Sequence, residues 1–182
     1  MIFLSYNHCK INSSLQTGIE TVIATNSEIL ELAVKIEREG KRFYAELSEH
    51  VNDAKVREFL NLMVKEEAAH EIHFKKMLET EDDLGWENDE NLKQLVKEKF
   101  QTDIFPPLEE MLTQLPRFEG LKKAFNFAIE AEKIAAEFYR MLTDACTNFE
   151  IKTHLALLEK AEREHCNVVE TLKSRVLDGL PH

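Results

Sequence analysis

The stretch EEAAHEIHF, Glu66–Phe74, places a glutamate and a histidine three positions apart on what the apolar spacing predicts to be the inward face of a helix. Residues i and i+3 of a helix lie about 60° apart, so Glu67 and His70 project to the same side. A buried carboxylate without a partner is costly. A glutamate and a histidine therefore occupy positions suited to leucine or isoleucine. If the same pair recurs elsewhere in the sequence, this placement indicates metal ligands.

The pattern does recur, 95 residues further along the chain. Without a gap, ten positions of Glu28–Leu78 are identical to their counterparts, near 20% against roughly 6–7% expected by chance. The identical pairs are Ala33/Ala128, Glu37/Glu132, Phe43/Phe138, Tyr44/Tyr139, Leu47/Leu142, Leu60/Leu155, Leu62/Leu157, Lys65/Lys160, Glu67/Glu162 and His70/His165. The sequence therefore predicts two copies of one helical hairpin.

Two polar motifs are preserved in the repeat. Glu-x-x-His occurs as Glu67/His70 and again as Glu162/His165, and a glutamate followed seven positions later by a tyrosine also occurs twice. A residue pair spaced by seven lies one above the other on a helix. We therefore consider two roles for Tyr44 and Tyr139: hydrogen bonds to the carboxylates, or half-buried aromatic packing.

Apolar spacing predicts an all-α protein, a four-helix bundle built from the two hairpins with one long connection. The first helix begins at Ser27, and Asn52 or Asp53 caps the second. One or two short helices are expected in 90–116, split by the FPP at Phe105–Pro107. A third long helix is predicted for Glu119–Cys146, and a fourth runs from a cap at Asn148 to about Val176.

These elements give a simple domain organisation. Residues 1–26 have no clear period and are predicted to be an N-terminal extension that is poorly ordered or peripheral. Residues 27–182 form the bundle, with the crossover at about 80–118. In the second helix, Phe59 and Ile72 are expected near the core side.

The turn positions predict that the polar residues meet. Glu37 and Glu67 are equally far from residue 52, so both stand about 22 Å from the turn of an antiparallel hairpin. Glu132 and Glu162 are equally far from residue 147. Pairing the hairpins gathers four carboxylates and two imidazoles in one layer. The predicted ligands are Glu37, Glu67, His70, Glu132, Glu162 and His165.

Charge and donor type indicate the metal. Four buried carboxylates repel each other, and two divalent cations balance their charge. Carboxylate oxygen with imidazole nitrogen suits iron or manganese, with zinc as a common substitute. One glutamate from each of two helices, with Glu-x-x-His from each of the others, is also the known arrangement of dinuclear carboxylate bundles.

Other polar residues near these motifs are assigned no metal role. Glu66, Glu71, His73, Glu130 and Glu164 are expected to be solvated or peripheral. His154 stands where Phe59 stands in the first hairpin, so it is expected to pack in the core. Cys166 adjoins His165 but points about 100° away from it on the helix.

Composition excludes several classes of function. A net charge of −11 disfavours nucleic acid and anionic membranes as partners, and the sequence has no run of about 18 apolar residues that would span a bilayer. The three cysteines, Cys9, Cys146 and Cys166, form no CxxC pair, which suits a reducing cytoplasm. The first residues lack the basic region and long apolar core of a signal peptide.

The segments AVKIEREGKRFY, EEAAH, AIEAEKIAAEFY and EREH resemble the ferritin-like superfamily, and most closely the rubrerythrin diiron domain, over about residues 28–175. The resemblance implies two iron ions held by the six predicted ligands. It also implies that Glu67 and Glu162 bridge the ions, that Glu37 and Glu132 are terminal, and that each iron has one histidine.

Two features depart from the rubrerythrin pattern. Rubrerythrins carry a further glutamate three residues after the third-helix ligand, where this sequence has Ala135. The redox-linked ligand exchange attributed to that glutamate is therefore not expected here. The four-cysteine rubredoxin-like domain also has no counterpart, so electrons are expected from an external, rubredoxin-like protein.

The resemblance and the ligand set predict an oxidoreductase that reduces hydrogen peroxide or dioxygen in oxidative-stress defence, as a cytoplasmic homodimer. Two alternatives stay open: ferritin-like iron oxidation with storage or delivery, and a non-catalytic helical bundle with a structural metal. The sequence also leaves open whether two chains exchange hairpins across the long crossover.

Overall fold

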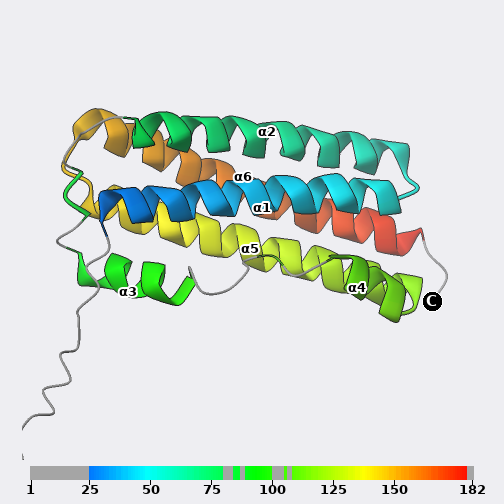
Figure 1. Ribbon diagram of the computed structural model, residues 1–182. Coiled ribbons are helices and arrows are strands. Elements are labelled where there is room, and N and C mark those ends of the chain that lie inside the picture. The colour runs from blue at the N-terminus through cyan, green and yellow to red at the C-terminus, as the bar shows by residue number, and fades with distance from the viewer. Residues whose placement is uncertain (1–24, 80–83, 87–88, 100–104, 106–107, 180–182) are drawn as a thin grey trace, which may run out of the picture.

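The computed structural model describes residues 25–79, 84–86, 89–99, 105 and 108–179. The predicted extension lies almost wholly outside this range, whereas most of the predicted crossover lies within it. All regular structure in the described residues is helical, in six elements (Figure 1). They are α1 (Asn26–His50), α2 (Ala54–Leu78), α3 (Glu90–Lys99), α4 (Leu108–Gln114), α5 (Arg117–Ala145) and α6 (Phe149–Asp178).

Three of the long helices begin at side-chain caps. Thr25 and Glu28 form a reciprocal capping box at the start of α1. Asp53 accepts hydrogen bonds from two backbone N–H groups at the start of α2, and Asn148 does the same for α6. The caps predicted at these two turns are confirmed, because a short polar side chain there satisfies N–H groups that the helix leaves unpaired.

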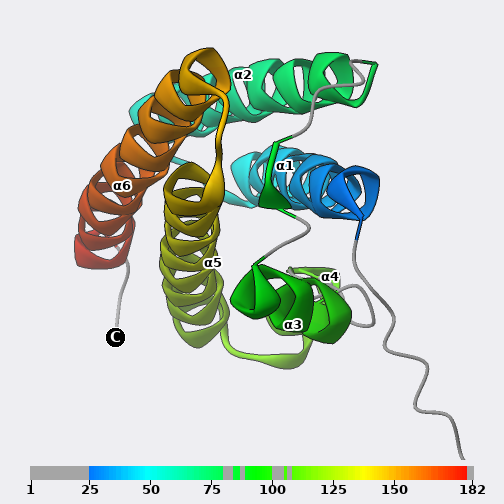
Figure 2. The same ribbon diagram turned by 90° about the vertical axis from the view of Figure 1, so that its left-hand side faces the viewer.

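The four long helices form a bundle of two antiparallel hairpins, α1 with α2 and α5 with α6, as predicted. Figure 2 shows the short helices α3 and α4 lying together beside α1 and α5, away from α2 and α6. One side of the bundle is therefore covered by the crossover. The α2 and α6 side is covered by none of the described residues.

The core consists of two apolar clusters, one towards each end of the bundle. The first includes Phe74, Trp86, Phe138 and Tyr139, and the second includes Phe43, Tyr44, Leu60 and Phe125. The predicted ligands lie along the helices between them. The apolar clusters hold the helices together and keep bulk water from the polar layer.

The beginning of the crossover is fixed to the end of α5. The buried Trp86 donates its indole N–H to the carbonyl of Leu142 at 3.0 Å, and the backbone N–H of Thr147 donates to the carbonyl of Leu84 at 3.1 Å. Between these contacts, Gly85 has a φ of 77°. A Cβ at this position would lie 2.7 Å from Cγ2 of Thr147.

We expect Gly85→Ala to lower the free energy of unfolding by about 1–3 kcal/mol, because it combines a left-handed backbone with a steric clash. Urea denaturation measures the loss. Gly179→Ala is the matched control, since φ there is −88° and the nearest atoms would lie at an ordinary 3.7 Å. Equal stability of the two variants would contradict the expectation.

Three side chains differ from the predicted burial. Phe59 and Ile72 were expected near the core side but are 48% and 54% exposed. His154 was expected to pack in the core and is also exposed. These side chains lie on the outer face of α2 and α6, which no described helix covers. Apolar spacing in the sequence therefore did not distinguish this outer face from the core. No helix in the described ranges is long and apolar enough to cross a bilayer.

Candidate metal centre

The six predicted ligands come together in one layer of the bundle. α1 contributes Glu37, α5 contributes Glu132, and α2 and α6 each contribute a Glu-x-x-His pair. The four glutamates are at most 3% exposed. Because both hairpins have arms of equal length around their turns, the four helices bring their polar positions to the same height.

The ligand atoms form two overlapping groups, each with all its members within 4.8 Å of one another. One group is Glu37, Glu67, His70 and Glu162, and the other is Glu67, Glu132, Glu162 and His165. Glu67 and Glu162 belong to both groups, whereas Glu37 and Glu132 belong to one each. Two adjacent metal positions that share two carboxylates would have this arrangement.

The buried donor atoms in this layer converge on one another. Nδ1 of His70 lies 3.3 Å from a Glu37 oxygen and 3.1 Å from a Glu162 oxygen, and Nδ1 of His165 lies 3.2 Å from a Glu67 oxygen. Such groups are costly to bury. The donor set of carboxylate oxygens and imidazole nitrogens fits iron or manganese. The residues present therefore fit a pair of divalent cations.

The two tyrosines orient the carboxylates that the groups do not share. Tyr44 on α1 donates its hydroxyl to Glu132 on α5, and Tyr139 on α5 donates to Glu37 on α1. Each tyrosine therefore crosses to the other hairpin. Burial, followed by the charge of the nearby glutamates, raises the pKa of both phenols well above its usual value. Both stay protonated and donate, the first of the two roles considered from the sequence.

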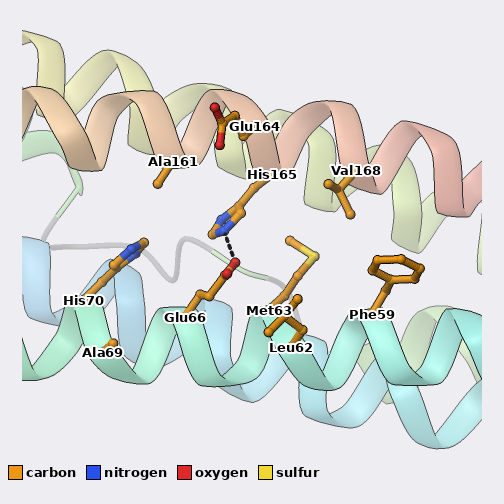
Figure 3. Close-up of a pocket in the computed structure, with 10 residues that line it drawn as sticks. All are labelled: Phe59, Leu62, Met63, Glu66, Ala69, His70, Ala161, Glu164, His165 and Val168. Atoms are coloured by element: carbon orange, nitrogen blue, oxygen red, sulfur yellow. Dashed lines mark hydrogen bonds and ion pairs between the residues drawn. The ribbon is translucent and has the colours of Figure 1, made fainter.

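Glu66 is the residue of the site that the sequence did not reveal. Its carboxylate lies 2.9 Å from Nε2 of His165 (Figure 3). Nδ1 of the same ring lies 3.2 Å from Glu67 and 3.2 Å from Glu162. A carboxylate on the outer nitrogen fixes which nitrogen is free to bind metal. The position equivalent to Glu66 in the other hairpin is Ala161, so the repeat carried no signal for it.

The two histidines are therefore not equivalent. His165 is held by Glu66, whereas His70 faces Ala161 across the gap between α2 and α6. The side chain of His70 is 15% exposed, against 5% for His165. A cavity of about 340 Å³ opens here between α2 and α6 and reaches both rings, with Phe59, Met63 and Val168 in its wall.

The pKa values of the buried glutamates are shifted by burial, by the neighbouring carboxylates and by hydrogen bonds with the two histidines. Burial, then the charges of Glu37 and Glu162, raises the pKa of Glu67 well above its usual value. Burial also raises the pKa of Glu132 to about 8. Burial also tends to raise the pKa of Glu162, but hydrogen bonds with His165 and His70 outweigh burial and lower that pKa below its usual value. Burial and mutual repulsion thus favour protonation of Glu67 and Glu132 over ionisation.

Metal binding at pH 7 is expected to release about two protons or more. Burial opposes protonation of His70, but hydrogen bonds with Glu162 and Glu37 outweigh it and raise its pKa to about 10. His70 and Glu132 are thus both protonated at pH 7 and must lose a proton to bind a cation. Metal affinity should therefore fall as the pH is lowered.

Calorimetric titration in buffers of different ionisation enthalpy counts the released protons directly. Binding without proton release, with an affinity that does not change between pH 6 and pH 8, would contradict the assignment.

The remaining polar residues lie outside both groups. Glu71 was expected to be solvated or peripheral, and it is peripheral but buried. Burial opposes ionisation there, but Lys41, Lys75 and Arg38 outweigh it and lower the pKa of Glu71 to about 2. Glu130 and Glu164 are exposed, as expected. Cys166 is half-buried and directs its Sγ to the carbonyl of Ile129.

Two solved structures resemble this chain. A candidate ferritin-like diiron-carboxylate protein from Thermotoga maritima superposes with a TM-score of 0.62 and 26% identity, covering 81% of this chain and 93% of that one. A hypothetical protein from Pyrococcus furiosus gives a TM-score of 0.56 at 22% identity, covering 86% and 92%, and supports the fold alone. No curated protein matches.

Among protein families, the rubrerythrin family matches residues 28–173. This range contains all four long helices except the first residues of α1 and the last of α6, and it includes every residue of both ligand groups. With most of the chain covered and the repeated carboxylate–histidine layer assembled in the bundle, the protein belongs to the rubrerythrin family of ferritin-like diiron proteins.

Proposed function

We propose that this protein is a non-haem diiron oxidoreductase that reduces hydrogen peroxide or dioxygen with electrons from an external donor. The observation that carries the proposal is the pair of overlapping ligand groups that share Glu67 and Glu162. The proposed ligands are Glu37, Glu67, His70, Glu132, Glu162 and His165. Manganese or zinc would fit the same donors as substitutes.

The two irons would supply one electron each to the oxidant. Glu67 and Glu162, which belong to both ligand groups, would hold the two ions close together. Tyr44 and Tyr139 fix the orientation of the terminal carboxylates, and Glu66 fixes the orientation of His165. These contacts keep the ligands in place when the charge of the centre changes, which lowers the cost of reorganisation.

The cavity between α2 and α6 supports a small oxidant. It reaches His70 and His165, and its wall includes the apolar side chains of Phe59, Met63 and Val168. A charged substrate would lose far more hydration free energy in such a cavity than an uncharged molecule such as hydrogen peroxide or dioxygen. The described crossover helices α3 and α4 lie on the opposite side, beside α1 and α5 (Figure 2), so they do not cover this cavity.

The source of electrons is part of the proposal. The sequence has three cysteines, too few for a four-thiolate iron site. We propose that a rubredoxin-like protein reduces the centre, on the resemblance to rubrerythrins. Cys146 and Cys166 are free thiols, which supports a reducing compartment, the cytoplasm. The exposed Phe149 is consistent with self-association, and we retain a homodimer as the proposed assembly.

Anaerobic Fe(II) titration of the metal-free protein, followed by stopped-flow absorbance on adding peroxide or dioxygen, tests the proposal. We expect saturation at two irons per chain and oxidation much faster than that of free Fe(II). Turnover with a reduced rubredoxin would support the donor. Oxidation no faster than in buffer would contradict an enzymatic role and favour a structural metal.

Native mass spectrometry separates the proposal from iron storage. A dimer agrees with the oxidoreductase, because storage needs a hollow shell of many subunits. A large closed assembly that accumulates iron well beyond two per chain would instead assign the centre to iron oxidation for storage.

A further inference from the structure

Two histidines outside the carboxylate layer lie together on the α2 and α6 side of the bundle. His73 on α2 and His154 on α6 have ring centroids 5.2 Å apart and ring planes at 85° to each other. They face a cavity of about 260 Å³ whose wall also includes His70 and Leu157. The proposed oxidoreductase centre uses neither of them.

We propose that His73 and His154 bind one divalent transition-metal ion, at a third metal position separate from the dinuclear centre. The class of ion follows from the donors. Two imidazoles without a carboxylate suit zinc, cobalt, nickel, copper or ferrous iron, and do not suit magnesium or calcium. Water would complete the coordination, since His154 is exposed.

The separation of the rings fits one shared ion. An imidazole nitrogen binds such an ion at about 2.0–2.1 Å, which places each ring centroid about 3.2 Å from the metal. Two centroids at that distance, with a tetrahedral angle at the metal, lie about 5.2 Å apart. The observed separation is 5.2 Å. The two rings therefore lie at the separation that a shared ion requires.

His73 supplies a donor atom that no other described residue uses. Its Nε2 is buried and has no hydrogen-bond partner. Burial, then the charges of His154, His70 and Lys76, lowers the pKa of the ring. The ring is thus mainly neutral at pH 7, with a lone pair available to a metal. The nearby positive charge of Lys76 opposes a cation, so we expect weaker binding here than in the dinuclear centre.

The position of the pair follows from the directions of the two helices. Glu67, His70 and His73 follow one another at three-residue intervals on α2. The helix α6 runs antiparallel to α2 (Figure 1). Continuing outward from the carboxylate layer therefore leads from His70 to His73 on one helix and from Glu162 to His154 on the other. The repeat gave no signal, because Phe59 occupies the position of His154 in the first hairpin.

Calorimetric titration of the metal-free protein with Co²⁺, followed by its visible absorbance, tests the proposal. We expect three ions per chain in the unmodified protein and two in His154→Ala, with the weakest ion lost. Loss of one of its two protein ligands should lower the affinity for this ion by at least about tenfold. His154 is exposed, so this variant is expected to fold; His73→Ala should show the same loss.

Two further variants separate this site from the dinuclear centre. His50→Ala is the matched control, because His50 is an exposed histidine at the end of α1, and it should still bind three ions. Glu162→Gln removes a carboxylate shared by both ligand groups and should keep the third ion. That ion should disappear when Glu162→Gln and His154→Ala are combined.

The outcomes decide the two proposals independently. One ion in the unmodified protein that is lost in His154→Ala would support the histidine pair and contradict the dinuclear centre. Two ions in both the unmodified protein and His154→Ala would overturn the histidine pair and leave the dinuclear centre intact.

Discussion

Substituting Glu162 by glutamine is expected to abolish binding of both metal ions in the carboxylate layer. Glu162 belongs to both ligand groups and is 1% exposed. An amide has no negative charge and gives up one of the two shared carboxylates. Loss of outer-shell partners alone costs about 10- to 100-fold in metal affinity, so loss of a ligand common to both positions should exceed about 100-fold. Fe(II) or Co²⁺ titration of the metal-free variant measures the effect.

Two glutamine variants make this prediction specific. Glu37→Gln removes a carboxylate found in one group only, and we expect one of the two ions to be lost. Glu164 lies two residues from Glu162 on α6, but its side chain is exposed and pairs with Lys160. The Glu164→Gln variant should therefore bind both ions with normal affinity. If Glu162→Gln still bound two ions with unchanged affinity, the assignment of Glu162 as a shared ligand would be wrong.

Metal loading is expected to stabilise the fold strongly. Without metal, the layer holds four buried carboxyl groups whose lost hydration opposes folding, and those that stay ionised repel each other. An ion that binds only the folded state adds about 4 kcal/mol when its free concentration is 1,000 times its Kd. For a chain of this size, about 4 kcal/mol corresponds to a rise in Tm of roughly 8–16 °C. Two ions should give more.

Thermal unfolding followed by circular dichroism, with and without Fe(II) or Co²⁺ under anaerobic conditions, measures this rise. A chelator should reverse it. Glu162→Gln is the control, since a variant that cannot fill the centre should show no comparable rise. If metal left the Tm of the unmodified protein unchanged, the four carboxylates would have to be stabilised by protons and hydrogen bonds alone.

Much of the site was predictable because the sequence contains the hairpin twice. A single Glu-x-x-His would be weak support, but Glu67/His70 and Glu162/His165 occur at a common spacing from their turns. Helix geometry then places them at one height, and the structure brings them together. The caps Asp53 and Asn148 were predictable for a similar local reason, since a cap depends only on its own helix.

Residues that depend on the other hairpin were harder to predict. The partners of Tyr44 and Tyr139 were open between packing and hydrogen bonding, and each proved to lie on the opposite hairpin. Glu66 was expected to be solvated or peripheral. Its contact with His165 could not be foreseen, because it forms only when α2 and α6 face each other in the bundle. The exposure of Phe59 and His154 likewise depends on which side the crossover helices cover.

The sequence by itself determined the helices, their pairing and the six residues of the carboxylate–histidine layer. Helix period and turn position are local properties, and both occur in each copy of the repeated hairpin. Only the tertiary structure decided which side chains meet across hairpins. The cross-hairpin bonds of the two tyrosines, the contact of Glu66 with His165 and the juxtaposition of His73 with His154 depend on how the helices rotate against each other, and that rotation is set by packing of the whole core.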